Sequence, residues 1–388
     1  MPEHQWDFVC LDPRKAKRAA VERALGPLGK ITFRKTAPLG YKTYPETAQR
    51  VVEAFASATQ KPTATLAVAA KKRLLALQYS GSRTYFEKHP DRVAVAWNGL
   101  NGTRRVFMDA AKDARAKTLY FELSPFKGRI TVDPCGVNYR NGLPRTAAPY
   151  VHWAKKHADD DGWRKLGTTI VARTGQQAPN AAATPRPLNE KFIFIPLQVP
   201  GDSQLRLFGG AFPTVEQVID AVAEAAKYLP DGWHARLKEH PTSPIKFGDR
   251  IAQLAHPQLV LDNVTDTFTQ VAAARAVVTV NSSVGLEAMF FEKPVAAIGD
   301  CFWAIDGIAN HCPTQDALNA LFAQPETLSY DPQARNGFLN FLSQHYYPEL
   351  DHDGPDGNLA PLEARKINAR LMGPDKLGFW TCNNGIAR

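Results

Sequence analysis

The 388-residue sequence lacks paired cysteines, long apolar runs and tandem repeats. Its five cysteines are scattered without a C-x-x-C pair, which argues against both a disulfide framework and a zinc site. No apolar stretch approaches the length of a membrane-spanning helix, and the first residues, MPEHQWDFVCLD, do not follow the pattern of a signal peptide. We therefore expect a cytoplasmic protein.

Acidic residues are the scarcer charged class. The 38 Asp and Glu residues stand against 47 Lys and Arg residues, a formal net charge of +9. Denser groups of cations occur at 15–18 and 71–73. Such groups usually lie on solvated helix faces, but they also suit an anionic sugar nucleotide, a phospholipid surface or nucleic acid. Because the cations are not interleaved with aromatic residues, nucleic acid is the weakest of these partners.

Short apolar runs alternate with helical patterns along the whole chain, which predicts an α/β fold in two domains. The stretch 174–189 is rich in Pro, Ala, Thr and Asn and is the best candidate for a linker. We therefore predict an N-terminal α/β domain at 1–189 and a Rossmann-like domain at 190–345. A tail at 346–388 is expected to pack back on the first domain.

The predicted elements of each domain follow from hydrophobic periodicity and from Gly, Pro and capping signals. In the first domain we expect strands at 5–11, 92–97 and 117–121, helices at 13–25, 45–58, 62–77 and 105–116, and an irregular segment at 124–145. In the second domain we expect strands at 192–197, 233–238, 260–262, 276–280 and 294–298, and helices at 214–229, 247–254 and 264–273. The strand at 294–298 is expected to close the sheet, and Thr214 with Gln217 forms a capping box.

The segment FIFIPLQVPGDSQ, residues 192–204, joins a buried strand to a polar loop. Pro200 and Gly201 end the strand, so Asp202 and Gln204 follow its carboxyl end, where ligands bind in open α/β sheets. Asp202 is the main candidate for contact with the substrate. The alternative is that its carboxylate caps a turn, which is ordinary for Asp after Pro-Gly.

Three further strand ends carry polar side chains. Glu122 follows the strand at 117–121, with a helix-cap or ion-pair role as the alternative to catalysis. Lys238 ends the strand at 233–238 and His240 follows it. An imidazole there could donate to a phosphate, although a lone His is more often structural. The strand at 276–280 leads into a helix that begins with polar residues, which suits a phosphate and the hydroxyl groups of a ribose. The residues in this turn are Asn281, Ser282, Ser283 and Glu287, and plain helix capping is their alternative role.

Taken together, these motifs resemble the bacterial capsule-polysaccharide synthesis family of β-Kdo glycosyltransferases, the KpsC-like proteins. The matching pieces lie between residues 97 and 299: WNGL at 97–100, FELSPFKGRITVDPCGVN at 121–138, PLQVPGDSQ at 196–204, KEHP at 238–241 and VNSSVGLEAMFFEKPVAAIG at 280–299. The resemblance implies a variant GT-B fold, with two Rossmann-like domains facing across a cleft. Asn98 departs from the common pattern, in which glycine is frequent, and Ser124 and Lys127 depart from it as well.

The resemblance also implies an activity, the transfer of Kdo with retention from CMP-β-Kdo to a glycan or lipid-linked glycan. It implies no metal and no resident cofactor. His240, Ser282, Ser283 and Glu287 would bind CMP. Retention by two inversions needs a carboxylate nucleophile and an acid/base group, about 5 Å apart in retaining glycosidases. We expect Asp202 to be the nucleophile and Glu122 the base, and the Kdo carboxylate to pair with Lys238, Arg206 or Arg275. Contact with the inner membrane is expected to be peripheral.

Two other functions fit the same sequence. One is a GT-B enzyme with another nucleotide-sugar donor, such as a UDP-sugar transferase or a GT-B-like epimerase. The other is a non-catalytic component of capsule assembly that binds a glycan or a nucleotide. Stabilisation by CMP but not by UDP would separate the first from a Kdo transferase, and indifference to loss of Asp202 would identify the second.

Overall fold

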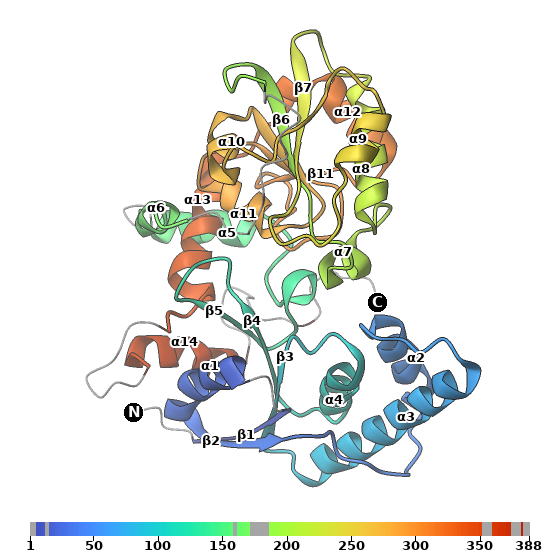
Figure 1. The fold of residues 1–388 in the computed structure, drawn as a ribbon. Helices are drawn as coiled ribbons and strands as arrows, with labels where there is room; N and C mark the ends of the chain where they lie inside the picture. The colour runs from blue at the N-terminus through green and yellow to red at the C-terminus, as the bar shows by residue number, and fades with distance from the viewer. Residues whose placement is uncertain are drawn as a thin grey trace. The chain divides into compact units, whose positions relative to one another are not determined.

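The computed structural model describes residues 5–11, 15–157, 161–170, 186–350, 359–373 and 382. The chain divides into two compact units (Figure 1). Unit 1 comprises Met1–Pro144 together with Gln344–Arg388, and unit 2 comprises Arg145–Ser343. Both units are built on a mainly parallel sheet with helices on its faces, as the alternation of apolar runs and helical patterns predicts.

Unit 1 contains a five-stranded sheet in the order β2-β1-β3-β4-β5. Its strands are β1 (Trp6–Leu11), β2 (Gly29–Arg34), β3 (Arg92–Trp97), β4 (Thr118–Leu123) and β5 (Ile130–Asp133). The first four are parallel, and β5 runs antiparallel to β4. Sequence reasoning missed β2 and β5: β2 is a partly exposed edge strand without a continuous apolar run, and β5 lies inside the segment expected to be irregular.

The described part of unit 1 contains five α-helices: α1 (Lys15–Leu25), α2 (Thr47–Ser57), α3 (Thr65–Lys88), α4 (Gly102–Asp113) and α14 (Pro361–Met372). Alternate residues of β1 serve opposite faces, since successive strand side chains point to opposite sides. Phe8 and Cys10 share a core with α1 and α14, whereas Val9 and Leu11 pack with α4 and the end of α3. Figure 1 shows α2 and α3 as the outermost layer on the α4 side.

A buried carboxylate links the segment around Tyr346 to the rest of unit 1. Asp133 accepts backbone N–H bonds from Cys135, Gly136 and Gly142, and a hydrogen bond from the Tyr346 hydroxyl at 3.1 Å. Burial raises the pKa of Asp133 even though the backbone donors favour its charged form. This carboxylate joins the loop after β5 to the segment that precedes α14.

A disulfide joins Cys135 to Cys382, with the two Cα atoms 4.9 Å apart. The expectation that the scattered cysteines form no disulfide is therefore wrong for this pair. Their separation of 247 residues gives no sign of proximity, because the fold alone brings the end of the chain back to the loop after β5. Cys10, Cys301 and Cys312 are buried, and none of them forms a disulfide with another described residue.

Unit 2 contains a six-stranded parallel sheet in the order β11-β10-β9-β6-β7-β8. The strands are β6 (Lys191–Pro196), β7 (Trp233–Lys238), β8 (Leu259–Leu261), β9 (Ala276–Thr279), β10 (Val295–Ala297) and β11 (Asn310–His311). This is the Rossmann strand order, and its direction of winding reverses between β6 and β9. The expectation that the strand at 294–298 closes the sheet is wrong, because β11 pairs beyond it.

The helices of unit 2 are mostly short: α5 (Ala148–Lys156), α6 (Gly162–Gly167), α7 (Ser203–Phe208), α8 (Val215–Ala226), α9 (Gly248–Gln253), α10 (Thr267–Ala273), α11 (Ser283–Met289), α12 (Gln315–Ala323) and α13 (Pro332–Phe341). As predicted, the Thr214 hydroxyl caps α8 by accepting the N–H of Gln217 at 3.3 Å. Among the described helices, none is both long and apolar enough to cross a membrane.

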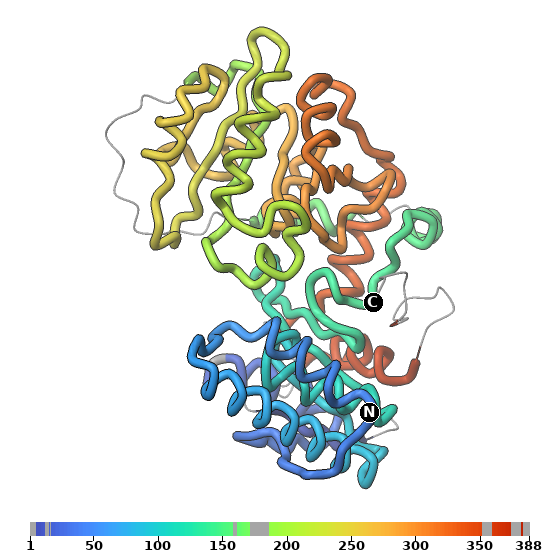
Figure 2. The backbone as a smooth tube through the Cα atoms, turned by 90° about the vertical axis from the view of Figure 1, so that its right-hand side faces the viewer, coloured from blue at the N-terminus to red at the C-terminus, as the bar shows by residue number. Residues whose placement is uncertain are grey.

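The structure groups residues 145–189 with unit 2, whereas the sequence analysis places the domain boundary between 189 and 190. The reason is the packing of α5 on α13, which run side by side (Figure 2). Tyr150 makes an edge-to-face contact with Phe338 at 5.0 Å, and the Trp153 indole donates to Asn340 at 2.7 Å. Most of the expected linker and two residues of the acidic run at 159–161 lie outside the described residues.

A buried histidine of β7 gives unit 2 a pH dependence. His234 is fully buried, stacks on Phe192 and accepts a hydrogen bond from the Arg236 side chain at 3.3 Å. Burial and the neighbouring guanidinium lower the pKa of His234 from 6.5 to about 4. The unfolded chain therefore binds an extra proton between these values. The contribution of neutral His234 to the free energy of unfolding is complete above pH 6.5, and it falls by up to about 3 kcal/mol as the pH drops toward 4.

We expect His234→Gln, which keeps an acceptor for Arg236, to flatten this part of the stability profile. Urea unfolding between pH 4.5 and 7.5 measures the difference between variant and wild type, so the carboxylates common to both cancel. His256→Gln, at a partly exposed histidine of the same unit, is the matched control. An unchanged slope in His234→Gln would contradict the assignment.

Candidate functional site

The carboxyl ends of β6 and β9 are joined by two polar side chains. Gln198 follows β6 and donates through its amide to the Asn281 side-chain oxygen at 3.0 Å, while the Asn281 N–H donates back to Gln198 at 3.3 Å. The two strands are neighbours at the point where the winding of the sheet reverses, and ligands of such folds bind outside this point. The predicted loop therefore lies where a ligand of a Rossmann-like unit is expected.

Asn281 sets the position of α7. Its side-chain amide donates to the backbone carbonyls of Gln204 and Phe208, both at 3.0 Å. These carbonyls lie in the first and last turns of α7, so one side chain holds the whole helix against the end of β9. Asn281 and Gln204, both candidates for donor binding, are thus in direct contact, and the Asn281 amide has a structural role.

Asp202 caps α7. Its Oδ1 accepts the N–H of Gln204 at 2.7 Å, and its own N–H donates to the Val199 carbonyl at 3.0 Å. The capping role that the sequence analysis offered as an alternative is therefore present. It occupies one carboxylate oxygen, and within the described part of the chain no residue donates to Oδ2. Asp202 is partly exposed, so this second oxygen can serve a further function.

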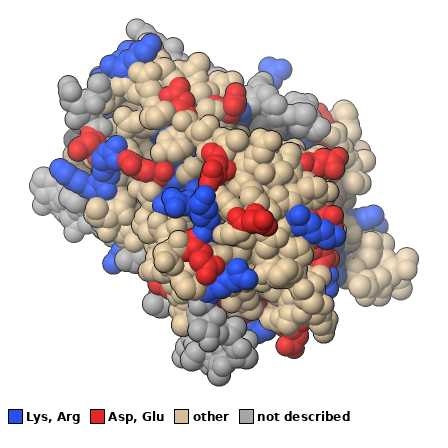
Figure 3. Space-filling view, turned by 90° about the horizontal axis from the view of Figure 1, so that it is seen from above, with Lys and Arg blue, Asp and Glu red and all other residues tan. Residues whose placement is uncertain are grey.

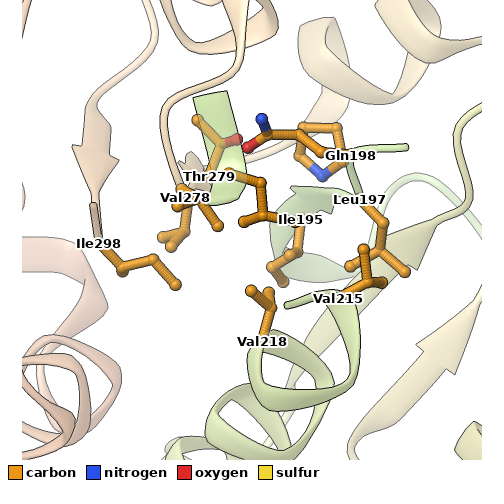
Figure 4. Close-up of a pocket in the computed structure, with 11 residues that line it drawn as sticks. Ile195, Leu197, Gln198, Val215, Val218, Val278, Thr279 and Ile298 are labelled. Atoms are coloured by element: carbon orange, nitrogen blue, oxygen red, sulfur yellow. The ribbon is translucent and has the colours of Figure 1, made fainter. Parts of the chain in front are cut away.

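An apolar cavity lies beneath these strand ends (Figure 4). It is lined by the ends of β6 and β9, by the segment after β10 and by α8, through side chains that include Ile195, Val218, Val278 and Ile298. Gln198 and Thr279 are the polar side chains of its lining. No ionisable residue lines the cavity. It is therefore a gap at the edge of the hydrophobic core and is not suited to bind a phosphate.

The turn after β9 caps α11. The Ser282 hydroxyl accepts the N–H of Val284 at 3.2 Å, and Ser283 is the first residue of the helix. Glu287 lies one turn further on and is 7% exposed. Capping is thus the observed role of Ser282, while Ser283 remains partly exposed at the start of the helix.

After the end of β7, a hydrogen bond from a backbone N–H to the imidazole ring orients His240. The Thr242 N–H donates to His240 Nδ1 at 3.2 Å, so Nδ1 is an acceptor and the hydrogen of the neutral ring lies on Nε2. Lys238 is buried, and its ammonium donates to the carbonyls of Asn263 and Thr265 at 3.0 and 2.8 Å. Burial lowers the pKa of Lys238. This lysine therefore holds the loop after β8, a role that the sequence did not indicate.

Sequence reasoning also missed Glu239, which is 2% exposed between Lys238 and His240. Its carboxylate accepts the N–H of Phe247 and the side-chain amide of Asn263, and its own N–H donates to Asn263 at 2.9 Å. These bonds tie the loop that carries His240 to the loop after β8. The sequence signal that could have identified Glu239 is its position directly after a buried strand.

In unit 1, Glu122 lies near the end of β4, opposite Thr131 of β5. Its Oε1 accepts the indole N–H of Trp97 at 3.1 Å and the N–H of Leu123 at 3.0 Å. Its Oε2 accepts the side-chain amide of Asn98 at 3.0 Å. In the described part of unit 1 these three donors orient the carboxylate, and no cation forms a salt bridge with it.

Asn98 is suited to this position by its backbone. Its φ of 63° lies in the left-handed region, which Asn tolerates better than most side chains. The Asn98 side-chain oxygen accepts from the Leu100 N–H and the Asn101 amide at 3.2 and 2.9 Å, so its NH₂ group must point to Glu122. Asn98, which stands where glycine is frequent, thus adds a hydrogen-bond donor to Glu122, the candidate base.

Lone-pair counting shows what the Glu122 carboxylate can still accept. Each carboxylate oxygen has about two acceptor sites. The two N–H donors fill Oε1, and the Asn98 amide takes one site of Oε2. One site on Oε2 remains for a hydroxyl group, which is the geometry that a general base requires.

Within the described residues no cluster of three or more His, Cys, Asp and Glu side chains could hold a metal ion. Charges of both signs are interspersed on the face shown in Figure 3, where Lys and Arg lie beside Asp and Glu. Glu122 belongs to unit 1, and the other candidate residues belong to unit 2.

Two Rossmann-like units with polar strand ends define an α/β protein of the GT-B class. A solved structure, Thermosulfurimonas dismutans KpsC, described as a β-Kdo 2,7-transferase, has this fold at a TM-score of 0.51 and 14% identity. The comparison covers 95% of this chain and all of that one.

Sequence comparisons identify the family. Residues 167–330 match the family model described as capsule polysaccharide biosynthesis protein. The chain is 31% identical to protein FixF of Sinorhizobium fredii over 285 residues, which is 72% of this chain and 67% of FixF. It is 27% identical over 176 residues to the capsule polysaccharide modification protein LipB of Neisseria meningitidis, which is 41% of each protein. The chain belongs to the KpsC-like capsule polysaccharide biosynthesis family.

Proposed function

We propose that this protein is a retaining β-Kdo glycosyltransferase that transfers Kdo from CMP-β-Kdo to a bacterial surface polysaccharide or glycolipid. The observation that carries the proposal is the Glu122 carboxylate, which three N–H donors orient at a strand end and which keeps one acceptor site. Family membership and the KpsC-like motifs support the choice of donor.

The chemistry is a double displacement. Asp202 Oδ2 attacks the anomeric carbon of Kdo, the bond to the phosphate oxygen breaks, and its electron pair leaves with CMP. The acceptor hydroxyl then attacks the same carbon while Glu122 takes its proton, and the bond to Asp202 breaks. Two inversions give net retention. CMP is a good leaving group, so the first step needs little acid assistance.

Donor binding is assigned to the strand ends of unit 2. His240 Nε2–H is a donor for the CMP phosphate, and Ser283 adds a hydroxyl at the start of α11. Gln204, Asn281, Ser282 and Glu287 complete the proposed nucleotide site. The ammonium of Lys238 already donates to two carbonyls. Arg275 precedes β9 and its N–H donates to Phe192 at the start of β6, so it lies at the amino ends of the strands, away from the proposed donor site. Of the three cations, we therefore assign the Kdo carboxylate to Arg206 on α7.

Incubation with CMP-Kdo and a panel of glycan acceptors tests the proposal. We expect a Kdo-containing product whose β configuration is read by NMR, and a rise in melting temperature with CMP but not with UDP. Stabilisation by UDP alone would contradict the choice of donor and favour a UDP-sugar enzyme or an epimerase. Binding of CMP-Kdo without transfer or hydrolysis would favour a non-catalytic component of capsule assembly.

A further inference from the structure

The first three turns of α3 expose apolar side chains to solvent. Leu66 is 86% exposed, and Leu74, two turns later, is 40% exposed. The alanines at 67, 69 and 70 are exposed as well. The buried face of this helix begins only at Leu75.

The exposed residues form a stripe on the side of α3 that faces away from the core. Leu66, Ala70 and Leu74 are four residues apart and therefore lie above one another on the helix. At 100° per residue, Leu75 and Tyr79, which are fully buried, lie on the opposite side from Leu66 and Ala70. An ordinary surface helix places polar residues on its solvent side. This helix places leucine and alanine there, together with Arg73, which is seven residues after Leu66.

A loop before α2 continues the stripe. The Gly40 N–H donates to the Leu77 carbonyl at 2.9 Å, and a Cβ atom on Gly81 would lie 2.3 Å from the Leu39 carbonyl carbon. Leu77 and Gly81 extend the same side of α3 beyond Leu74, so the loop crosses the helix on the stripe. Two large side chains of this loop are exposed, Leu39 at 62% and Tyr41 at 88%.

Cations outnumber acidic residues around the stripe. No Asp or Glu occurs between Glu53 and Glu87, a stretch that contains five cations, at 61, 71, 72, 73 and 83. Lys72 lies over the Phe55 ring at 5.3 Å. Lys42 and Arg83 form salt bridges with Glu87 at 3.5 and 3.1 Å, so the positive charge beside the stripe is assigned to Lys61 and to the group at 71–73. An apolar stripe flanked by cations complements a surface whose apolar interior lies beneath anionic groups.

We propose that the α3 stripe, formed by Leu39, Tyr41, Leu66, Ala70 and Leu74, docks unit 1 on an anionic lipid bilayer. The leucines and the tyrosine enter the boundary between headgroups and acyl chains, while the flanking lysines and arginine contact lipid phosphates. The apolar stripe supplies binding that persists at high salt, and the cations supply the preference for anionic lipid. This inference is independent of the proposed catalytic residues.

Vesicle sedimentation with the full-length protein tests the proposal. Vesicles of phosphatidylcholine alone are compared with an equimolar mixture of phosphatidylcholine and phosphatidylglycerol. We expect the wild type to bind the mixture preferentially. Neutralising 71–73 as Lys71→Gln, Lys72→Gln and Arg73→Gln should weaken that binding on the order of 100-fold, because each cation contributes about a factor of five. Leu66→Ser with Leu74→Ser should reduce it by at least about tenfold.

The matched control is Tyr228→Ser with Leu254→Ser, which removes two exposed apolar residues from unit 2. The changed side chains are exposed, apart from Lys71, which is partly exposed, so melting temperatures should stay at the wild-type value and report folding directly. Equal binding by the stripe variants and the control would overturn the proposal. Binding to heparin or nucleic acid but not to vesicles would overturn it too, as would a wild-type dimer that the leucine changes dissociate.

Transfer to a water-soluble acceptor separates this inference from the proposed function. The stripe variants should retain wild-type turnover on such an acceptor while losing vesicle binding. A protein that binds vesicles through the stripe but transfers no Kdo would refute the proposed function and leave the docking surface intact.

Discussion

Asp202→Asn should lower Kdo transfer by roughly 10⁴-fold or more while leaving the fold unchanged. Asparagine caps a helix as well as aspartate does, so the bond from the Gln204 N–H is kept and α7 stays in place. What the variant lacks is the anionic Oδ2 that would form the ester with Kdo. Intact-protein mass spectrometry with CMP-Kdo and no acceptor should show a Kdo adduct on the wild type and none on the variant.

Two companion variants separate chemistry from capping. Asp202→Ala loses both the nucleophile and the cap, so its stability should also fall by about 1 kcal/mol. Asp266→Asn changes the carboxylate that caps α10 in the same unit, where Asp266 accepts the N–H groups of Phe268 and Thr269. It should transfer Kdo at the wild-type rate. A Kdo adduct that persists in Asp202→Asn would refute the nucleophile assignment.

Glu122→Gln should slow transfer by about 10²- to 10⁴-fold, the usual contribution of a general base. Since departure of CMP needs little acid assistance, the first displacement still proceeds and the second stalls. We therefore expect the Kdo adduct to accumulate in this variant in the presence of acceptor. Rapid quenching followed by mass spectrometry measures the adduct, which the wild type should transfer to acceptor without accumulation.

The hydrogen bonds around Glu122 provide the control. In Glu122→Gln the new NH₂ group would face the Asn98 NH₂, two donors at about 3.0 Å, and Asn98 cannot reverse because its oxygen accepts from Leu100. Adding Asn98→Asp replaces one donor with an acceptor and should restore stability without restoring transfer. Recovery of activity in the double variant would show that Glu122 acts only through its position.

Strands β6 and β7 could be predicted within a residue. β6 is a short apolar run, β7 alternates apolar and polar residues, and Pro, Gly or charged residues bound both. The helix predicted at 62–77 continues instead to Lys88. Its second half, QYSGSRTYFEK, contains small and polar residues that break the apolar period. Gly81 is buried because the chain at Gly40 crosses the helix there, whereas Gln78 and Tyr79 are buried by contacts with Thr103 and Asp113 of α4. No local pattern reports these contacts.

For the candidate site, the positions could be predicted but several roles could not. Parallel strands place their carboxyl ends at one edge, so Asp202 and Asn281 were found from the residues that follow each strand. That the Asn281 amide holds α7, or that Lys238 binds the loop after β8, depends on partners far away in the sequence. The hydrogen bonds between Glu239 and Asn263 could not be predicted either, because the two residues belong to loops after different strands.

The order of apolar runs and turn residues by itself determined that this chain forms two units with mainly parallel sheets and polar groups at the strand ends. It could do so because the hydrophobic period and the residues that break strands and helices act over a few neighbouring residues. Only the tertiary structure decided which of those groups are engaged by their neighbours. It gave the Glu122 carboxylate three donors, committed the Lys238 ammonium to two carbonyls and joined Cys135 to Cys382. The reason is that hydrogen bonds and disulfides act over a few ångströms, and segments hundreds of residues apart reach that distance only when the sheet and its helices have packed.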